Sequence, residues 1–378
     1  MYMFDKTDRY KYGQFFTPSS MCNKILKMVD KINPIQGDVL EPSFGKGNFL
    51  KALQKYKDIN SITGVEIDKD FFSHFTKRNK NICADLENID FLDFKNKRQF
   101  DLIIGNPPYI ELCYSFYDKD KIEQIKNDYK DMSNKGRMNI VHIFLLRSLE
   151  MIKDGGIIAF LLPTAILTSP VYNKIREKIY DDFSVKYVNE HIEFDDITLR
   201  ICLLIIKKEK TKDKNFFYVT NNNFYITNNF NKIKTNKTLK DYGFEVEIGE
   251  VVWNKRKDIL TDDNRYNKLI YSYNITRGHL IDKRSKNEEK KSFIKKTKVR
   301  HKNCIILPRT IYKELRFFYV ENNKDMNFEN HVLVIKNKNK ALLKAFYDKL
   351  QDDEYEKIIK TFFNSTNLTI QEVLSLPY

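Results

Sequence analysis

An Asn-Pro-Pro-Tyr turn (Asn106–Tyr109) directly follows a buried-strand pattern at Phe100–Gly105 (FDLIIG). Two consecutive prolines fix the backbone and remove two amide donors, which leaves nearby carbonyl oxygens available as acceptors. The side-chain oxygen of Asn106 and a neighbouring carbonyl can then accept both hydrogens of one NH₂ group, while Tyr109 offers a flat face to an aromatic ring. The turn therefore predicts chemistry on the amino group of a planar substrate.

A glycine-rich turn, EPSFGKGN, follows an earlier apolar segment. Gly45 and Gly47 allow the backbone to approach a ligand closely before a helix begins. The third glycine of the dinucleotide fingerprint is absent because Leu50 occupies that position, and Glu41 places negative charge where a pyrophosphate would bind. The turn suits a cationic ligand, such as an ammonium beside a sulfonium, although taken alone it is equally typical of a plain connector.

A third feature is Glu66, at the end of the segment SITGVEI and nineteen residues after Gly47. A carboxylate at the tip of such a strand can accept hydrogen bonds from both hydroxyls of a ribose. Ile67 follows as an apolar wall for an adenine ring. An exposed acid at a strand end is the simpler alternative, so the other motifs decide between the two interpretations.

These turns must be positioned by the elements around them. Apolar runs predict strands at residues 38–40, 61–67, 100–105, 156–162, 185–188 and 201–206, the first four being typical of buried parallel strands. Helical periodicity alternates with them at residues 19–31, 48–57, 69–78 and 139–153. This alternation predicts an α/β fold with an open, doubly wound sheet, in which ligands bind at the carboxyl ends of the strands.

A length of 378 residues indicates about two domains. The charged stretch KKEKTKDKN after the sixth predicted strand is a plausible boundary, which gives domains at 1–210 and 211–378. The second domain is expected to be mixed α+β. Its predicted strands are 246–253, 304–308, 315–320 and 332–335, and its predicted helices are 340–351 and 353–363.

Positive charge is concentrated in the C-terminal part of the chain. The formal net charge is +15, and residues 1–210 contain 33 Lys and Arg against 30 Asp and Glu, whereas residues 211–378 contain 33 against 21. The segment Lys283–Lys302 contains ten Lys or Arg residues and only two Glu residues. Such a segment can neutralise phosphates and steer the protein toward nucleic acid, although a solvated lysine-rich loop explains a charge run alone.

Other classes of protein are disfavoured. The chain has no apolar run of about 18 residues and no apolar signal-peptide core at its start, so we expect a soluble, cytoplasmic protein without membrane contact. The five cysteines occur singly without a C-x-x-C pair, which favours a reducing compartment. The six histidines form no H-x-x-x-H pair, and we expect no metal site.

Taken in order, the motifs resemble those of the gamma-class S-adenosylmethionine-dependent DNA adenine-N6 methyltransferases. YGQFFTP (residues 12–18) resembles the N-terminal cofactor motif of that family, EPSFGKG its methionine-binding loop, GVEID its ribose-binding acid and NPPY its catalytic motif. The resemblance extends over residues 10–206. Downstream, VVWNKRKDIL, LPRTIYKEL and FFNSTNLT are only reminiscent of the family's variable target-recognition domain.

The resemblance implies a Rossmann-like methyltransferase sheet, S-adenosylmethionine as cofactor and double-stranded DNA as partner, with a separate cognate restriction endonuclease as a further possible partner. It assigns cofactor binding to Thr17, Glu41, Ser43, Gly45, Gly47, Glu66, Ile67, Asp90, Phe91, Asn106 and Phe144, with Asp85 as a rival to Asp90. It assigns catalysis to Asn106, Pro107, Pro108 and Tyr109, and stacking on the target base to Tyr109 and Phe194. We expect DNA contacts from Lys283, Arg284, Lys295, Lys296, Lys298 and Arg300.

Three alternatives stay open on sequence grounds. Adenine-N6 methylation of RNA would use the same chemistry. Protein glutamine methyltransferases also use an N-P-P-Y turn, because a glutamine amide presents a similar planar NH₂, but they do not need a basic C-terminal domain of this size. A non-catalytic nucleic-acid-binding module would leave the NPPY turn and the cofactor-loop residues unexplained.

Overall fold

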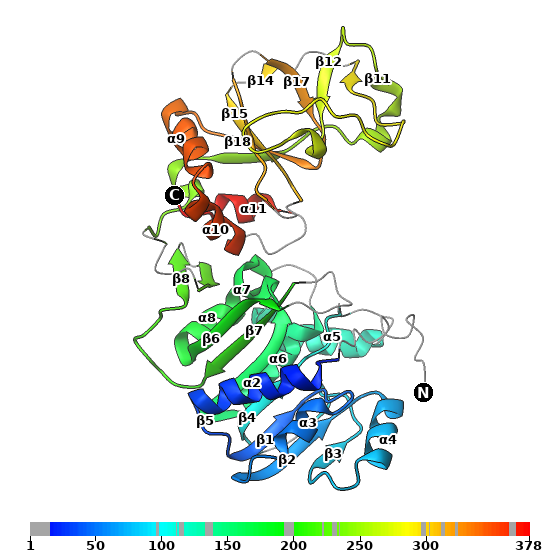
Figure 1. Cartoon of the computed structure of the whole chain (residues 1–378), viewed down its shortest axis with the longest axis vertical. Helices are drawn as coiled ribbons and strands as arrows, with labels where there is room; N and C mark the ends of the chain where they lie inside the picture. Colours follow the sequence, from blue (N-terminus) through cyan, green and yellow to red (C-terminus); the bar gives the residue numbers. More distant parts are fainter. Residues whose placement is uncertain are drawn as a thin grey trace. The chain divides into compact units, whose positions relative to one another are not determined.

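The computed structural model describes residues 16–95, 98–110, 112, 117–132, 139–192, 200–220, 223–228, 233, 235–295, 300–301, 303–310, 314–321, 324–362 and 368–378. The chain forms two compact units, both drawn in Figure 1. The first contains the described residues up to Leu167 together with Val171–Phe217 and Asn223–Asn228. The second contains Thr168–Pro170, 218–220 and the described residues from 233 onward.

A seven-stranded sheet with the order β3-β2-β1-β4-β5-β7-β6 forms the centre of the first unit. Its five strands from β3 to β5 are parallel, and β7 runs antiparallel to both of its neighbours. The predicted open α/β sheet is therefore confirmed, including the parallel direction of its first four predicted strands. The strands are β1 (Gly37–Glu41), β2 (Ile59–Val65), β3 (Asp85–Glu87), β4 (Phe100–Gly105), β5 (Ile152–Pro163), β6 (Ser184–Ile192) and β7 (Ile201–Lys207).

Helices flank this sheet and connect its strands. They are α2 (Ser19–Ile32), α3 (Asn48–Leu53), α4 (Lys69–Arg78), α5 (Lys119–Asp128), α6 (Ile140–Met151), α7 (Ala165–Thr168) and α8 (Asn173–Asp182). The four helices expected from periodicity are present, but α3 ends at Leu53, earlier than predicted. The Tyr56 N–H bonds the Leu53 carbonyl at 3.0 Å in a turn, which leads the chain into β2. The short strand β9 (Asn223–Ile226) also lies in this unit.

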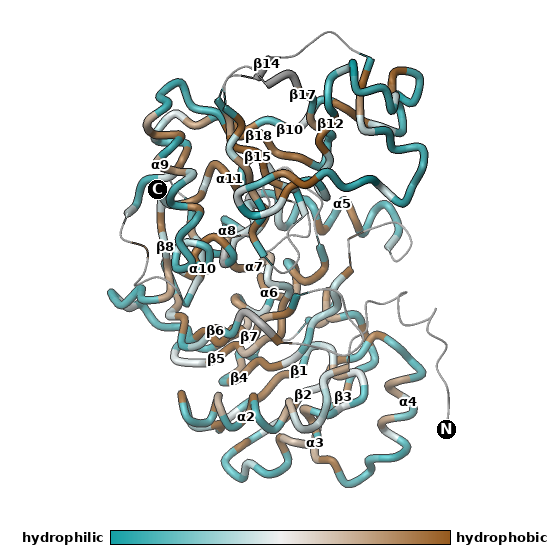
Figure 2. Tube along the Cα trace, turned by 45° about the horizontal axis from the view of Figure 1, so that its top comes forward, coloured by the Kyte–Doolittle hydropathy of each residue, from teal (hydrophilic) through white to brown (hydrophobic). Residues whose placement is uncertain are grey.

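Both faces of the sheet are buried. On one face, α2 and α3 pack through Leu26, Val29 and Leu50 against strand residues that include Val39 and Leu102 (Figure 1). The alternate strand residues Leu40, Ile103 and Ile158 are equally buried, and hydrophobic colour follows β1 and β4 in Figure 2. Replacing Leu26, which is 1% exposed, by alanine should destabilise the fold by about 2–5 kcal/mol because a cavity would form beneath α2.

The second unit is built from two further sheets. The order is β10-β18-β15-β16 in one, and β11-β13-β12-β17-β14 in the other, where only the β12–β17 pair is parallel. The strands of the first sheet are β10 (Glu245–Ile248), β15 (Cys304–Pro308), β16 (Phe318–Val320) and β18 (Val332–Lys336). Those of the second are β11 (Leu260–Thr261), β12 (Asn267–Ile270), β13 (Phe293–Ile294), β14 (Arg300–His301) and β17 (Lys324–Phe328); β8 (Phe217–Thr220) lies near the start of the unit.

Helices complete the second unit, so its predicted mixed α+β character is confirmed. They are α9 (Lys340–Leu350), α10 (Asp353–Phe362) and α11 (Ile370–Leu374). The short 3₁₀ turns of this unit are η4 (Leu239–Tyr242), η5 (Trp253–Lys255), η6 (Lys257–Ile259) and η7 (Ser272–Asn274), whereas η1 (Lys130–Met132) and η2 (Pro170–Tyr172) lie earlier in the chain. A core of Ile270, Ile306, Phe328 and Val334 joins the two sheets. The strands predicted at 246–253 and 315–320 are shorter in the structure: β10 ends at Ile248 and η5 begins at Trp253, and β16 begins only at Phe318.

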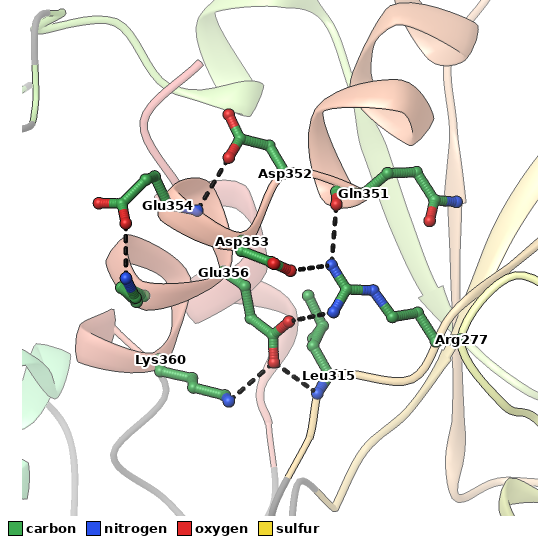
Figure 3. Close-up of polar contacts among 9 residues, drawn as sticks. Arg277, Leu315, Gln351, Asp352, Asp353, Glu354, Glu356 and Lys360 are labelled. Carbon is green, nitrogen blue, oxygen red and sulfur yellow. Dashed lines mark hydrogen bonds and ion pairs between the residues drawn. The ribbon is translucent and has the colours of Figure 1, made fainter.

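Ion pairs and hydrogen bonds connect α10 to the turn that contains Arg277 (Figure 3). The Arg277 guanidinium contacts the carboxylates of Asp353 at 2.7 Å and Glu356 at 2.9 Å. Glu356 also accepts from the Leu315 N–H at 3.1 Å and pairs with Lys360 at 2.7 Å. Its side chain is only 8% exposed, so these partners compensate the desolvation of a nearly buried charge.

Candidate active site

Three loops of the first unit meet at the carboxyl edge of the parallel sheet. They follow β1, β2 and β4, which are neighbours in the sheet. The Gly45 N–H of the first loop donates to the Glu66 carboxylate of the second at 2.7 Å. The Ser43 hydroxyl donates to the Asn106 carbonyl of the third at 3.3 Å. The structure thus brings together the three motifs that the sequence placed in separate turns.

Glu66 is the link between two of these loops. Its Oε2 accepts from Gly45, and its Oε1 accepts from the Asp68 N–H at 2.8 Å. Burial, with only 5% of the residue exposed, raises the pKa of the Glu66 carboxyl to about 7, and the two N–H donors act in the opposite direction. Asp68 in turn caps α4 by accepting from the Asp70 and Phe71 N–H groups. Beside them, the Ile67 side chain is 48% exposed, an apolar surface at the strand tip.

The glycines of the first loop are required by its backbone. Gly45 has a φ of +52° and Gly47 a φ of +66°, in the left-handed region that favours glycine. A Cβ on Gly47 would also lie 1.9 Å from the Phe75 ring. Helix α3 starts at the next residue, so the loop presents backbone close to whatever binds at the edge of the sheet.

Two buried polar atoms near this loop have no hydrogen-bond partner among the described residues. They are Oε2 of Glu41, at the end of β1, and Oγ1 of Thr17, just before α2. Glu41 is 2% exposed and Thr17 6% exposed. Burial, followed by the negative charge of Glu66, raises the pKa of the Glu41 carboxyl well above its ordinary value. Buried acceptors without donors are unfavourable, so this pair fits a ligand that supplies N–H groups and positive charge.

The Asn-Pro-Pro-Tyr turn is fixed from several sides. The Tyr109 hydroxyl lies within hydrogen-bonding distance of Asn106 Oδ1, and also 3.0 Å from the Leu161 carbonyl on β5. Burial raises the pKa of Tyr109 well above its ordinary value, so the hydroxyl remains a proton donor. The Ile110 carbonyl accepts from the Ile140 N–H at 2.9 Å, which ties the end of the turn to the start of α6. Pro107 is buried, and Pro108 is partly buried.

Of the two acids considered for an adenine amino group, the structure places Asp90 at the edge of the sheet. β3 pairs with β2 through Asp85 opposite Thr63 and Glu87 opposite Val65. Asp85 is therefore the first residue of β3, at its amino end, whereas Asp90 follows the carboxyl end of the strand. Asp85 is exposed. Asp90 accepts from the Leu92 N–H at 2.9 Å, and burial raises the pKa of its carboxyl.

Phe91 and Phe144 pack against each other, with ring centroids 4.8 Å apart. They are 1% and 5% exposed, so both rings are largely enclosed by protein. The Arg147 guanidinium, which like Phe144 belongs to α6, lies 5.3 Å from the Phe91 centroid. The two phenylalanines therefore form an aromatic pair that connects the Asp90 turn to α6.

The remaining predicted site residues are placed only in part. Phe194, Lys296 and Lys298 lie outside the described residues, and for Arg300 the description covers only the backbone, in β14. Lys283, Arg284 and Lys295 are exposed in the second unit. The sequence analysis missed the Leu161 carbonyl and Asp68. A backbone carbonyl on a neighbouring strand leaves no signal in the sequence, whereas Asp68 before a helical pattern is typical of an N-cap.

Two negative findings concern only the residues that the structure describes. Within them, no three or more His, Cys, Asp and Glu side chains gather in a way that could hold a metal ion. Across the same part of the chain, none of the helices has the length and apolar character needed to span a membrane.

The sheet and its edge loops define a class: the fold is a Rossmann-like methyltransferase sheet with added antiparallel sheets in the C-terminal part. Residues 42–197 match the family model described as the Eco57I restriction-modification methylase. A match to such a family implies S-adenosylmethionine as the cofactor.

The chain is also similar to curated proteins and to a solved structure. The chain is 32% identical over 206 residues to modification methylase CviBIII of Paramecium bursaria Chlorella virus NC1A, covering 53% of this chain and 51% of that protein. It is 27% identical over 271 residues to type II methyltransferase M.AccI of Acinetobacter calcoaceticus, covering 68% and 45%. The chain thus spans about half the length of these relatives. A class I S-adenosylmethionine-dependent methyltransferase structure from Listeria monocytogenes matches with a TM-score of 0.45 and 20% identity, over 53% of this chain and 63% of that one.

Proposed function

We propose that this chain is a DNA methyltransferase of a restriction-modification system, which transfers a methyl group from S-adenosylmethionine to N6 of adenine. The observation that carries the proposal is the Asn106–Tyr109 turn, held beside the buried carboxylates of Glu41 and Glu66. The relatives named above as modification methylases and type II methyltransferases support the DNA substrate. In this proposal residues 1–210 bind cofactor and perform catalysis, and residues 211–378 recognise DNA.

The residues at the edge of the sheet fit S-adenosylmethionine. The Glu41 and Thr17 acceptors suit the ammonium of its amino-acid part, and the positive charge there offsets the cost of two buried carboxylates. Glu66 would accept from the ribose hydroxyls, and exposed Ile67 would cover the adenine. Asp90 would accept from the adenine amino group. When bound, the cofactor supplies an electrophilic methyl group on a sulfonium.

The turn acts on the nucleophile. Adenine N6 is weakly nucleophilic because its lone pair is delocalised into the ring. Asn106 Oδ1 and the Pro107 carbonyl would accept its two hydrogens and favour a pyramidal nitrogen with an available lone pair. These acceptors bind more strongly as positive charge develops on the nitrogen, so they stabilise the transition state. The proton can leave to water afterwards, and we assign no general base.

Access to the base requires that it leave the helix. N6 of a stacked, paired adenine cannot reach a turn at the edge of a protein sheet, so the target base must be flipped out of the duplex. Tyr109 would replace part of the lost stacking, with Phe194 as the second aromatic residue. The positive charge of the C-terminal part would bind the phosphates, with Lys283, Arg284 and Lys295 exposed for this purpose. A cognate endonuclease and a cytoplasmic location remain predictions.

The test is incubation of the purified protein with labelled S-adenosylmethionine and plasmid DNA, followed by nucleoside analysis. We expect label in N6-methyladenine at one recurring sequence. Label in methylated cytosine would contradict the adenine assignment. RNA and a glutamine-containing protein substrate serve as parallel reactions, and preferential label in either would replace DNA as the substrate. The Asn106→Ala variant is the control for catalysis by a contaminant.

A further inference from the structure

Lys290 lies within a cluster of three aromatic rings in the second unit. Its Nζ is 4.9 Å from the Trp253 centroid, 5.3 Å from that of Tyr271 and 5.9 Å from that of Tyr273. The two tyrosine rings are stacked, with centroids 5.1 Å apart and planes within 7°. An ammonium within about 6 Å of a ring is attracted by the ring quadrupole, so this lysine is already engaged by its own protein.

A buried carboxylate reinforces this position. Glu329 is 1% exposed, and its Oε2 accepts from the His331 N–H at 3.0 Å. Its Oε1 has no hydrogen-bond partner among the described residues. The positive charge of Lys290 acts on this carboxyl, and the negative charge of Glu329 acts on both tyrosines of the cluster. The ammonium thus lies against aromatic faces and close enough to Glu329 for the charges of the two groups to interact.

The same tyrosine rings also contact the chain on either side of Lys290, at Ser285 and Lys291. The Tyr271 hydroxyl donates to the Lys291 carbonyl at 3.0 Å, and the Tyr273 hydroxyl is hydrogen-bonded to the Ser285 side chain. The Lys291 ammonium pairs with Asp262 at 3.0 Å. Two lysines of the basic run, Lys290 and Lys291, therefore make side-chain contacts within the protein.

Three other cations of this segment are exposed to solvent. Lys283, Arg284 and Lys286 are exposed, and they lie within seven residues of Lys290 in the chain. Two of the acidic neighbours are paired elsewhere: Glu289 with Lys257 at 2.6 Å, and Asp282 with Lys268 at 3.1 Å. The exposed cations are thus free of these two acids to attract phosphate.

We propose that Lys290 is a positioning residue for DNA binding and not a phosphate contact. Anchored among Trp253, Tyr271 and Tyr273, it holds the segment so that Lys283, Arg284 and Lys286 meet the backbone of duplex DNA. This role rests on the proposed DNA methyltransferase function. In this proposal one basic run contains an anchoring residue, Lys290, and a set of DNA-contacting residues, Lys283, Arg284 and Lys286.

The single tryptophan of the chain, Trp253, reports on the anchor directly. In Lys290→Met without DNA, we expect a changed emission spectrum and stronger quenching by acrylamide, because the ammonium no longer covers the ring. The matched control, Lys286→Met, should leave both unchanged. For binding of a fluorescein-labelled duplex at 0.1 M salt, we expect about a tenfold loss of affinity in Lys290→Met.

Two comparisons distinguish anchoring from contact. Tyr273→Leu should weaken DNA binding similarly, and the Lys290→Met/Tyr273→Leu double variant should be no weaker, because both remove one anchor. Lys290→Arg should restore affinity, since a guanidinium also stacks on aromatic faces. Lys286→Met should lower the slope of log affinity against log salt by about 0.9, as expected for one lost phosphate contact.

Unchanged tryptophan quenching in Lys290→Met would overturn the anchor. The anchor would also be overturned if Lys290→Met and Tyr273→Leu weakened DNA binding additively and Lys290→Met changed the slope of log affinity against log salt as much as Lys286→Met does. If Lys286→Met loses affinity for DNA and Lys290→Met does not, the positioning role of Lys290 is overturned and the proposed function is unaffected. An absence of DNA binding by the unaltered protein overturns the proposed function and this role together.

Discussion

The Tyr109 hydroxyl lies within hydrogen-bonding distance of Asn106 Oδ1, three residues earlier in the same turn. A second acceptor, the Leu161 carbonyl on β5, lies 3.0 Å from the same hydroxyl. An amide oxygen has two lone pairs, so Asn106 can accept from Tyr109 and still accept from a substrate amine. In the proposed reaction, this contact would orient the amide oxygen before the target base arrives.

We expect Tyr109→Phe to lower kcat about three- to tenfold, since a typical hydrogen bond contributes about 0.5–1.5 kcal/mol and the ring is kept. Tyr109→Ala, which also removes the ring, should cause a much larger loss. Single-turnover methylation of plasmid DNA measures both. Equal rates in the unaltered protein and in Tyr109→Phe would show that the hydroxyl does not orient Asn106.

Asn106→Ala should slow methyl transfer severely and leave cofactor affinity within about threefold, because the amide is assigned to the amine of the base. Removal of one preorganised acceptor of this kind costs about 10²–10³ in kcat, and the carbonyl acceptor alone cannot compensate. Isothermal titration with S-adenosylmethionine gives the affinity, and methylation assays give the rate. Near-normal turnover in this variant would refute the assigned role.

Cofactor affinity should depend on pH through Glu66. The pKa of this carboxyl in the folded protein is raised to about 7, and in the proposed site the ribose hydroxyls would bind its ionised form. Affinity should therefore be highest above pH 7 and fall as the pH drops below that value, by up to tenfold per pH unit. Glu66→Gln should bind more weakly at pH 8 and lose this dependence. A flat profile in the unaltered protein would exclude Glu66 from the ribose site.

Glu41→Gln should separate stability from function. The folded-state pKa of Glu41 is raised by burial, so its favourable contribution is complete below the ordinary pKa of 4.5 and is lost as pH rises through the folded value. At pH 8 the glutamine variant should unfold at the same or a higher temperature, yet bind S-adenosylmethionine at least tenfold more weakly. Unimpaired binding in this variant would remove Glu41 from the ammonium site.

The network of Figure 3 predicts a stability effect confined to the second unit. Glu356→Ala removes the acceptor shared by Arg277, Lys360 and the Leu315 N–H, and should destabilise the protein by about 2–4 kcal/mol. Arg277→Met should cost less, because Glu356 keeps two partners. Urea unfolding measures both, and an equal cost for an exposed control, Glu354→Ala, would argue against a special role for Glu356.

The sequence by itself determined six of the seven strands in the large sheet and four helices of the first unit, and it showed which residue types in the turns could do chemistry. Alternating strand and helix patterns located the strands at Phe100–Gly105 and Ile201–Lys207 correctly, because continuous apolar runs are typical of strands buried on both faces. The NPPY turn and the acid at Glu66 depend on residue type and local spacing, both of which are visible in a single sequence. The resemblance to a methyltransferase family rested on these same local features.

Only the tertiary structure decided which of these groups contact each other. The antiparallel direction of β7, the Glu66–Gly45 bond and the approach of Tyr109 to Leu161 join residues from different strands. The division of the basic run into an anchored lysine and exposed cations depends on rings brought from Trp253 and Tyr271, outside that run. Local sequence cannot encode such pairings, because they follow from how the sheets pack and which polar groups are buried as a result.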